Sequence, residues 1–330
     1  MPGVFRTNNP FSIILLFFYG LVLRYAAFIE PHIPVAQLTD GFLYHGLIRS
    51  LENMGRNSPV IYSVISYTLV FAQALMLNNF MYQHRLMAKA NYLPALSYIL
   101  ITAMFPEWWQ LSSTLIVNTF MIWGWTSMTS LYKNQRSKQL IFNIGIIIGI
   151  CSFFYFPSIG FLILLAAALV IMRPVNISEW LIGILGVTTP YYFLLAWQYL
   201  RGHWNPKDYI PSIHLSYPLF QQTIWAWGGL LLLIIPFLMS GFYIQGAILR
   251  MLILTRKGWS LMLLYLLCGL MIPFINSTAT FEYWILSAVP FAAFHSNVFF
   301  SAQKKLIPNV LHLLMLVFIL ALNWWVLKSS

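Results

Sequence analysis

The chain has 330 residues, of which 60% are hydrophobic and only 8% are charged, and its mean hydropathy is +0.77. A soluble domain carries about 25% charged residues, so this chain has too few charges to cover its own surface with water-binding groups. The excess apolar surface must face lipid. This predicts an integral membrane protein and excludes a soluble enzyme, a secreted disulfide scaffold and a disordered chain.

Apolar runs bounded by charged residues or proline predict about eleven membrane spans, measured against the ~20 residues that a bilayer requires. The first run is expected to be a retained span, since no A-x-A-like cleavage site follows it. No soluble insert separates the runs, so residues 1–330 are expected to form a single integral membrane domain, an all-α polytopic helical bundle. The predicted spans cover residues 11–29, 58–80, 92–106, 111–131, 140–156, 158–172, 179–199, 222–249, 259–276, 279–299 and 308–327.

Basic residues indicate the orientation, because cytoplasmic loops of membrane proteins are enriched in Lys and Arg. With the N-terminus inside, twelve basic residues fall on the inner side and five on the outer side, with Arg24 inside a span, which predicts an N-in, C-out topology. Glu179 then falls inside and Glu282 about one turn into a span, whereas the outer loops hold Glu30, Asp40, Glu52, Glu107 and Asp208. Any chemistry is therefore expected at the outer face.

The first outer loop contains an amphipathic segment from Gly41 to Met54, with Leu43, Leu47, Leu51 and Met54 on one helical face. Such a segment predicts an interfacial helix that lies along the membrane surface. Asp40 stands directly before it. Two interpretations of Asp40 stay open: it caps the helix N-terminus, or it is a base at the membrane surface.

Arg24 is predicted about one turn below the outer boundary, where an unpaired charge costs several kcal/mol. Three interpretations are open for its side chain. It snorkels to the interface, it anchors an anion inside the bundle, or it forms a structural ion pair with Glu282. A second long outer loop follows Arg201 and supplies His203, Lys207 and Asp208.

Other chemistries find little support in the residues. The net charge of +11 reflects basic loops, and no basic stripe with aromatic residues indicates nucleic-acid binding. The chain has no Walker loop, no GxGxxG before a helix and no H-E-x-x-H, so no nucleotide, haem or iron cluster is indicated, whereas a divalent cation stays open. Cys151 and Cys268 lie in apolar runs and are expected to be core residues.

The segment DGFLYHGLIRSLENMG, Asp40 to Gly55, followed by Pro59, resembles the N-terminal module of GT-C type glycosyltransferases. The resemblance covers about residues 1–200, with C-terminal spans over about 222–330. It implies a lipid-linked sugar donor, a polyprenyl-phosphate sugar, used at the outer face, with Asp40 and Glu107 as catalytic residues. The segment Phe281 to Phe294 resembles the entry of a late span in which Glu282 replaces an expected Arg. Substrate binding would then fall to Arg24, Arg201, His203 and Glu282.

The segments Asn8 to Gly20 and Asn91 to Trp108 also resemble an uncharacterised family of multi-pass inner-membrane proteins from Bacteroidota. This resemblance implies location in the cell inner membrane but no activity. Beside the glycosyltransferase-like enzyme, two other functions stay open. One is a non-catalytic accessory subunit that binds other membrane proteins in an envelope assembly or export complex. The other is a lipid or solute transporter, which the gathering of polar groups near one face disfavours.

Overall fold

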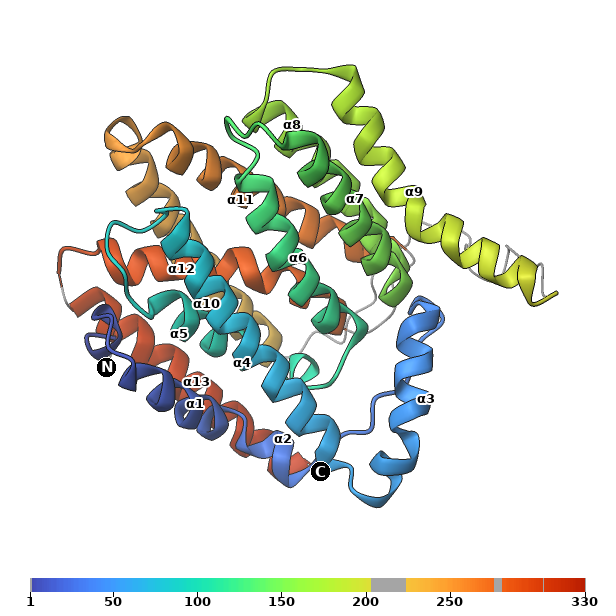
Figure 1. Ribbon diagram of the computed structural model, residues 1–330. Helices are drawn as coiled ribbons and strands as arrows, with labels where there is room; N and C mark the ends of the chain where they lie inside the picture. Colours follow the sequence, from blue (N-terminus) through green and yellow to red (C-terminus); the bar gives the residue numbers. More distant parts are fainter. Residues whose placement is uncertain (1, 203–223, 276–280, 305, 330) are drawn as a thin grey trace.

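The computed structural model describes residues 2–202, 224–275, 281–304 and 306–329, and within these ranges it contains helices and no β-strand (Figure 1). Each predicted apolar run contains a helix. The α-helices are α1 (Phe11–Leu23), α2 (Tyr25–Ile29), α3 (Phe42–Asn57), α4 (Val60–Gln83), α5 (Leu93–Thr102), α6 (Ser113–Thr129), α7 (Ser137–Phe154), α8 (Phe161–Met172), α9 (Ile177–Leu200), α10 (Ile224–Ala247), α11 (Ile253–Met271), α12 (Ala288–Ser301) and α13 (Leu306–Ser329).

Seven helical segments in the described ranges are long and apolar enough to cross a membrane. Three further apolar helices are shorter and cover Phe11–Leu23, Leu93–Thr102 and Phe156–Met172. This confirms the prediction of an all-α, multi-pass membrane protein in a lipid bilayer. The seven segments are Val60–Gln83, Ser137–Phe154, Ile177–Leu200, Ile224–Arg250, Ile253–Phe274, Glu282–Ser301 and Leu306–Lys328.

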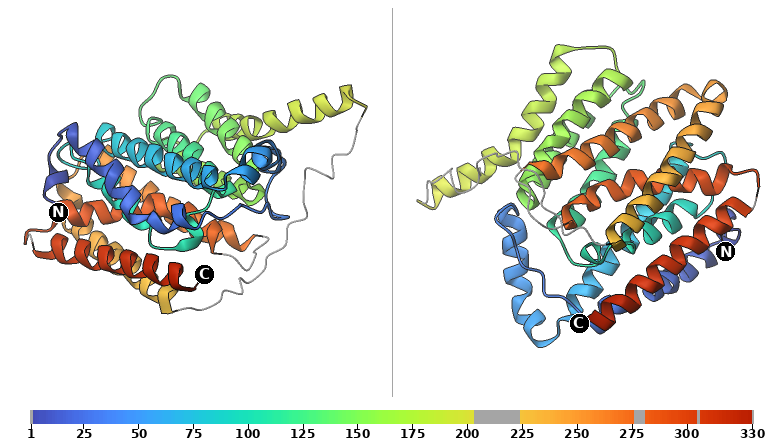
Figure 2. Two further views of the ribbon diagram at one scale, coloured as in Figure 1. Left: turned by 90° about the horizontal axis from the view of Figure 1, so that it is seen from below. Right: turned by 180° about the vertical axis from the view of Figure 1, so that it is seen from behind.

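The core of the bundle is built on α5 and α12, which pack against each other. Every residue of α5 is buried, and 89% of the most apolar 18 residues of Glu282–Ser301 are buried, against 17% of those of Ile177–Leu200. The N-terminal α1 and the C-terminal α13 lie side by side along one edge (Figures 1 and 2). On the opposite edge, the C-terminal half of α9 extends away from the other helices.

Glycines bring the backbones of α7 and α9 into direct contact. A Cβ atom added to Gly145 would lie 2.6 Å from the Gly183 carbonyl oxygen, and one added to Gly186 would lie 2.4 Å from the Phe142 oxygen. Small residues permit such close approach of membrane helices, where van der Waals packing replaces the hydrophobic effect as the driving force. Because α9 packs mainly on α7, this contact determines how α9 joins the bundle.

The break between α1 and α2 falls at Arg24, whose φ of −119° and ψ of 23° interrupt the helix. Asn323 of α13 stabilises the interruption. Its side-chain amide donates to the Leu23 carbonyl at 2.9 Å and accepts from the Ala26 backbone N–H at 3.1 Å. One buried side chain therefore satisfies both backbone groups that the break would leave unpaired.

Helix α3 confirms the predicted amphipathic helix, with bounds at Phe42 and Asn57, and it is not one of the candidate membrane spans. Figure 1 shows it across one end of the bundle, between the ends of α7 and α4. Its inner face is slightly rotated from the predicted one. Leu47 and Leu51 pack on the bundle together with Tyr44 and Ile48, whereas Leu43 lies outside that cluster and the side chain of Met54 lies outside the described residues.

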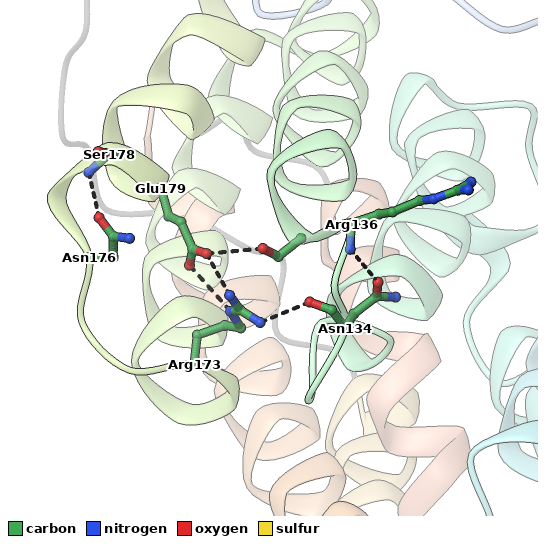
Figure 3. A network of polar contacts seen from close by, with 7 residues as sticks. Asn134, Arg136, Arg173, Asn176, Ser178 and Glu179 are labelled. Carbon is green, nitrogen blue, oxygen red and sulfur yellow. Dashed lines mark hydrogen bonds and ion pairs between the residues drawn. The ribbon is translucent and has the colours of Figure 1, made fainter.

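At the opposite end of α7, an ion pair ties the start of α9 to its neighbours (Figure 3). The Arg173 guanidinium lies 2.8 Å from the buried Glu179 carboxylate, which also accepts a hydrogen bond from Ser137 at 3.0 Å. Arg173 donates further to the Asn134 carbonyl at 3.0 Å. Glu179 is thus neutralised within the fold.

Both cysteines are free. Cys151 is buried, as expected of a core residue, whereas Cys268 is only half-buried.

Candidate functional site

Asp40 lies buried beside the start of α3, with 8% of its surface exposed. Three donors from three parts of the chain bind its carboxylate. They are the Ser113 hydroxyl at the start of α6, the Gln37 backbone N–H at 2.8 Å and the Tyr283 hydroxyl at 3.4 Å. Tyr283 belongs to the 3-10 helix η7 (Glu282–Ser287) that leads into α12. Tertiary contacts therefore fix the carboxylate from more than one side.

The interpretation of Asp40 as the N-cap of α3 is wrong. The first-turn N–H groups of Tyr44 and His45 are bonded to the Gly41 carbonyl, and no hydrogen bond recorded for the described residues joins the Asp40 carboxylate to α3. Gly41 rather than Asp40 directly precedes the helix. Its N–H donates to the Phe154 carbonyl at 2.7 Å, so the backbone is bound to the end of α7 and leaves the Asp40 side chain turned toward the bundle.

One further acid, Glu282, lies near Asp40, and a third, Glu107, lies near Glu282. Glu282 interacts electrostatically with both Asp40 and Glu107, and the Tyr283 hydroxyl interacts with the carboxyl groups of Glu282 and Asp40. The ring of Tyr283 stacks on that of Tyr155, with centroids 4.7 Å apart. The structure thus links Asp40 to Glu282 and Glu282 to Glu107, three acids that the sequence placed in or near the outer loops. It does not arrange them as metal ligands: within the described ranges, no three His, Cys, Asp or Glu side chains are grouped to hold a metal ion.

Burial makes the carboxyl groups of Asp40 and Glu107 harder to ionise. Removal from water raises the pKa of Asp40, and the hydrogen bonds from Ser113, Gln37 and Tyr283 only partly oppose this, together with the charge of His45. Burial also raises the pKa of Glu107, which lies in the 3-10 helix η2 (Pro106–Trp108). A carboxyl group with a raised pKa is a better proton acceptor once ionised, which is the property that a general base requires.

Arg24 lies apart from these acids. It is 1% exposed and donates to the Thr102 carbonyl at 2.7 Å, with the hydroxyls of Tyr67 and Tyr98 nearby. The snorkelling interpretation is therefore wrong. The ion pair with Glu282 does not form either, since the structure records no salt bridge between these two described residues. Of the three interpretations, only an anion anchor inside the bundle stays open.

The other predicted binding residues are not gathered around Asp40. Arg201 is exposed at the end of the projecting half of α9, where its guanidinium lies 4.3 Å from the centroid of the Trp197 ring. His203 lies outside the described residues, as do Lys207 and Asp208. The substrate-binding roles of Arg24, Arg201 and His203 stay predictions.

The sequence did not single out Ser113, Tyr155 or Tyr283 as members of the site. Ser113 offered one signal, because Ser112 and Ser113 follow directly on the outer connection that holds Glu107, and Ser112 proves to cap α6 by accepting from the Leu115 N–H at 3.1 Å. The two tyrosines gave none, since aromatic residues are frequent at membrane interfaces. Comparison of the chain with models of protein families, with curated proteins and with solved structures gives no significant match.

Proposed function

We propose that the protein is a membrane-embedded, glycosyltransferase-like enzyme that acts on a lipid-linked sugar donor, with Asp40 as its base. The observation that carries the proposal is the way Asp40 is held. Its carboxylate is fixed by donors from separate segments, has a raised pKa and serves no helix cap. Burial of such a group costs stability, and active sites are where such costs recur.

In the proposed reaction, the Asp40 carboxylate takes the proton of an acceptor hydroxyl. The acceptor oxygen forms a bond to the anomeric carbon of the donor, and the bond from that carbon to the phosphate oxygen breaks, which releases a polyprenyl phosphate. Glu282 lies close enough to Asp40 and to Glu107 for both carboxyl groups to act on it electrostatically. Neutralisation of the departing phosphate would fall to Arg24 or Arg201, neither of which lies beside Asp40, so the donor phosphate would have to lie away from Asp40 and toward one of them.

The proposal includes a topology and a location. The chain is taken to cross the cell inner membrane about eleven times, N-in and C-out, so that Asp40, Glu107 and Glu282 lie at the outer face. The arrangement of basic residues supports this orientation. Lys133, Arg136 and Lys138 lie between the end of α6 and the start of α7, whereas Asp40 lies beside Ser113, at the opposite end of α6.

A non-catalytic accessory subunit is the second candidate. One observation favours it: only 8% of Asp40 is exposed, and a carboxylate this enclosed also fits a purely structural role. The two functions differ in what they require of Asp40. A base requires charge and proton affinity, whereas a structural acceptor requires only an oxygen in the same place.

The test compares Asp40→Asn with Asp40→Ala in cells that lack the chromosomal copy, with envelope glycans as the readout. Asparagine keeps one oxygen for the Gln37 N–H, and its amide NH2 can donate to the Ser113 hydroxyl, but it cannot act as a base. An enzyme therefore predicts that both variants fail although Asp40→Asn is present at the normal level. Glu52→Gln, on α3 and outside the cluster, is the matched control and should restore the glycans. Full restoration by Asp40→Asn would refute the enzyme and favour the accessory subunit.

A further inference from the structure

Two lysine ammonium groups meet at one aromatic ring, at the end of the bundle away from Asp40. The Nζ atoms of Lys133 and Lys257 lie 5.6 and 4.7 Å from the centroid of the Tyr132 ring. Tyr132 follows the C-terminal end of α6, whose first residue, Ser113, binds Asp40. At 1.5 Å per residue, the length of α6 separates the two places by about 25 Å. This is a separate feature from the acidic cluster.

Three segments of the chain build this basic end. The Thr255 hydroxyl at the start of α11 donates to the Arg85 carbonyl at 3.1 Å, and His84 lies 3.1 Å from the Thr129 hydroxyl. The connection after α4 and the connection after α6 each contain a basic residue whose backbone is in the left-handed region, with φ of 54° at Arg85 and 53° at Lys133. Residues other than glycine rarely adopt this backbone conformation, which costs them about 1 kcal/mol or more. The fold therefore fixes the backbone of both connections at these residues.

The fold supplies no carboxylate for the two lysines. No ion pair of Lys133 or Lys257 is recorded within the described part of the chain. Glu179 lies near this end, but Arg173 and Ser137 occupy its carboxylate. Like charges held near one ring repel each other unless an anion lies between or beside them, and the ring itself binds each cation only weakly. The arrangement leaves both charges available to an anion from outside the chain.

The surroundings indicate that this anion belongs to a lipid. The turn that leads into α11 exposes three aliphatic side chains, Leu249, Leu252 and Ile253, at 90%, 59% and 53%. Ile253 lies one helical turn before Lys257, so the two are neighbours on the surface of α11. Exposed aliphatic side chains at the level of the lysines fit the interfacial region of a bilayer, where lipid phosphates lie, whereas a free phosphate ion would gain nothing from them.

We propose that Lys133, Lys257 and the ring of Tyr132 form a binding site for the phosphate headgroup of an anionic phospholipid. The two ammonium groups bind the phosphate, and the aliphatic residues before Lys257 lie beside it in the interfacial region. Helical side chains lean toward the helix N-terminus, so the ammonium group of Lys257 extends toward the end of the bundle, where headgroups lie. The site does not depend on the function proposed for Asp40.

The experiment measures which lipids the whole protein retains when it is purified in detergent containing equal amounts of phosphatidylglycerol and phosphatidylcholine and analysed by native mass spectrometry. The wild-type chain should retain phosphatidylglycerol preferentially. Lys133→Gln and Lys257→Gln should each lower that retention about five-fold, as expected for one basic residue near a membrane surface, and the double variant should lower it by about the product. Lys257→Arg should retain the lipid.

Lys138→Gln is the matched control, because Lys138 is an exposed lysine on the same end without a recorded contact to an aromatic ring, and it should leave retention unchanged. An equal loss in this control would overturn the proposal in favour of diffuse attraction. Equal retention of phosphatidylcholine, or complete displacement of phosphatidylglycerol by inorganic phosphate, would also overturn it. Unchanged thermal unfolding of the Gln variants ensures that lost retention reports the site.

Discussion

Replacing Gly186 with alanine should weaken the attachment of α9 to the bundle. The added Cβ atom would lie 2.4 Å from the Phe142 carbonyl oxygen and 2.9 Å from the Gly145 Cα atom. Ordinary contacts of this kind are about 1 Å longer, and because the opposing atoms are backbone, the two helices must move apart. Overpacking of this sort costs about 1–3 kcal/mol, which exceeds the gain of up to about 1 kcal/mol from the higher helix propensity of alanine.

Gly241 of α10 provides the matched control, because no atom lies within 4 Å of the position its Cβ would take. Gly241→Ala should therefore show only the gain in helix propensity. The assay is thermal unfolding in detergent, followed by a thiol-reactive dye that labels Cys151, a buried residue of α7, in a Cys268→Ser background. Gly186→Ala should unfold at a lower temperature than its parent, and Gly241→Ala at the same or a higher one. Equal midpoints for the two variants would refute the reasoning.

Three further predictions follow from other parts of the fold. Asn323→Leu should lower the free energy of unfolding by about 1–3 kcal/mol for each backbone group that it leaves unpaired, measured by the same thermal assay. Burial raises the pKa of Asp40, so at pH values between its unfolded and folded pKa the folded state holds a proton that the unfolded state has released. The midpoint temperature of unfolding should therefore fall as the pH rises through this interval, and it should fall less in Asp40→Asn. Reporter fusions at Lys133 and at Asp208, which lies outside the described residues, should report opposite sides of the membrane, and a shared side would refute the orientation.

The helices could be predicted because lipid imposes a strong constraint. Inside a bilayer each backbone group must be bonded within the segment, so a long apolar run has few alternatives to a helix. Residues 111–131 and 158–172, for example, became Ser113–Thr129 and Phe161–Met172. The bounds shifted where local contacts decided them. Helix α3 continues to Asn57 rather than ending at Met54. Its buried face includes Tyr44 and Ile48. Successive residues of a helix are 100° apart around its axis, so four leucine or methionine positions define the buried face only coarsely.

The environment of Arg24 could not be predicted, because it depends on residues far away in the chain. Its guanidinium finds the Thr102 carbonyl only because α5 ends there, and the break at Arg24 is stable only because Asn323 lies beside it. Periodicity shows which face of a helix is apolar, but it does not say which other helix covers that face. The ion pair between Arg24 and Glu282 was predicted wrongly for the same reason. The two residues share a predicted depth in the membrane, but the sequence does not show that they lie in different parts of the bundle.

Asp40 shows the same limit and also why one substitution tests it sharply. From the sequence alone, an acid directly before an amphipathic helix serves as a cap or as a chemical group, and both interpretations predict the same position. The structure removes the cap, because Gly41 precedes α3 and the carboxylate is turned toward Ser113 and Tyr283. What it leaves is an acid whose ionised form is penalised by burial. Asp40→Asn lifts that penalty, keeps one oxygen for the Gln37 N–H and places an NH2 group where the Ser113 and Tyr283 hydroxyls can accept from it, so the variant should be at least as stable as the wild type at neutral pH. If it is also inactive, the charge serves the reaction at the expense of stability, as expected of a functional residue.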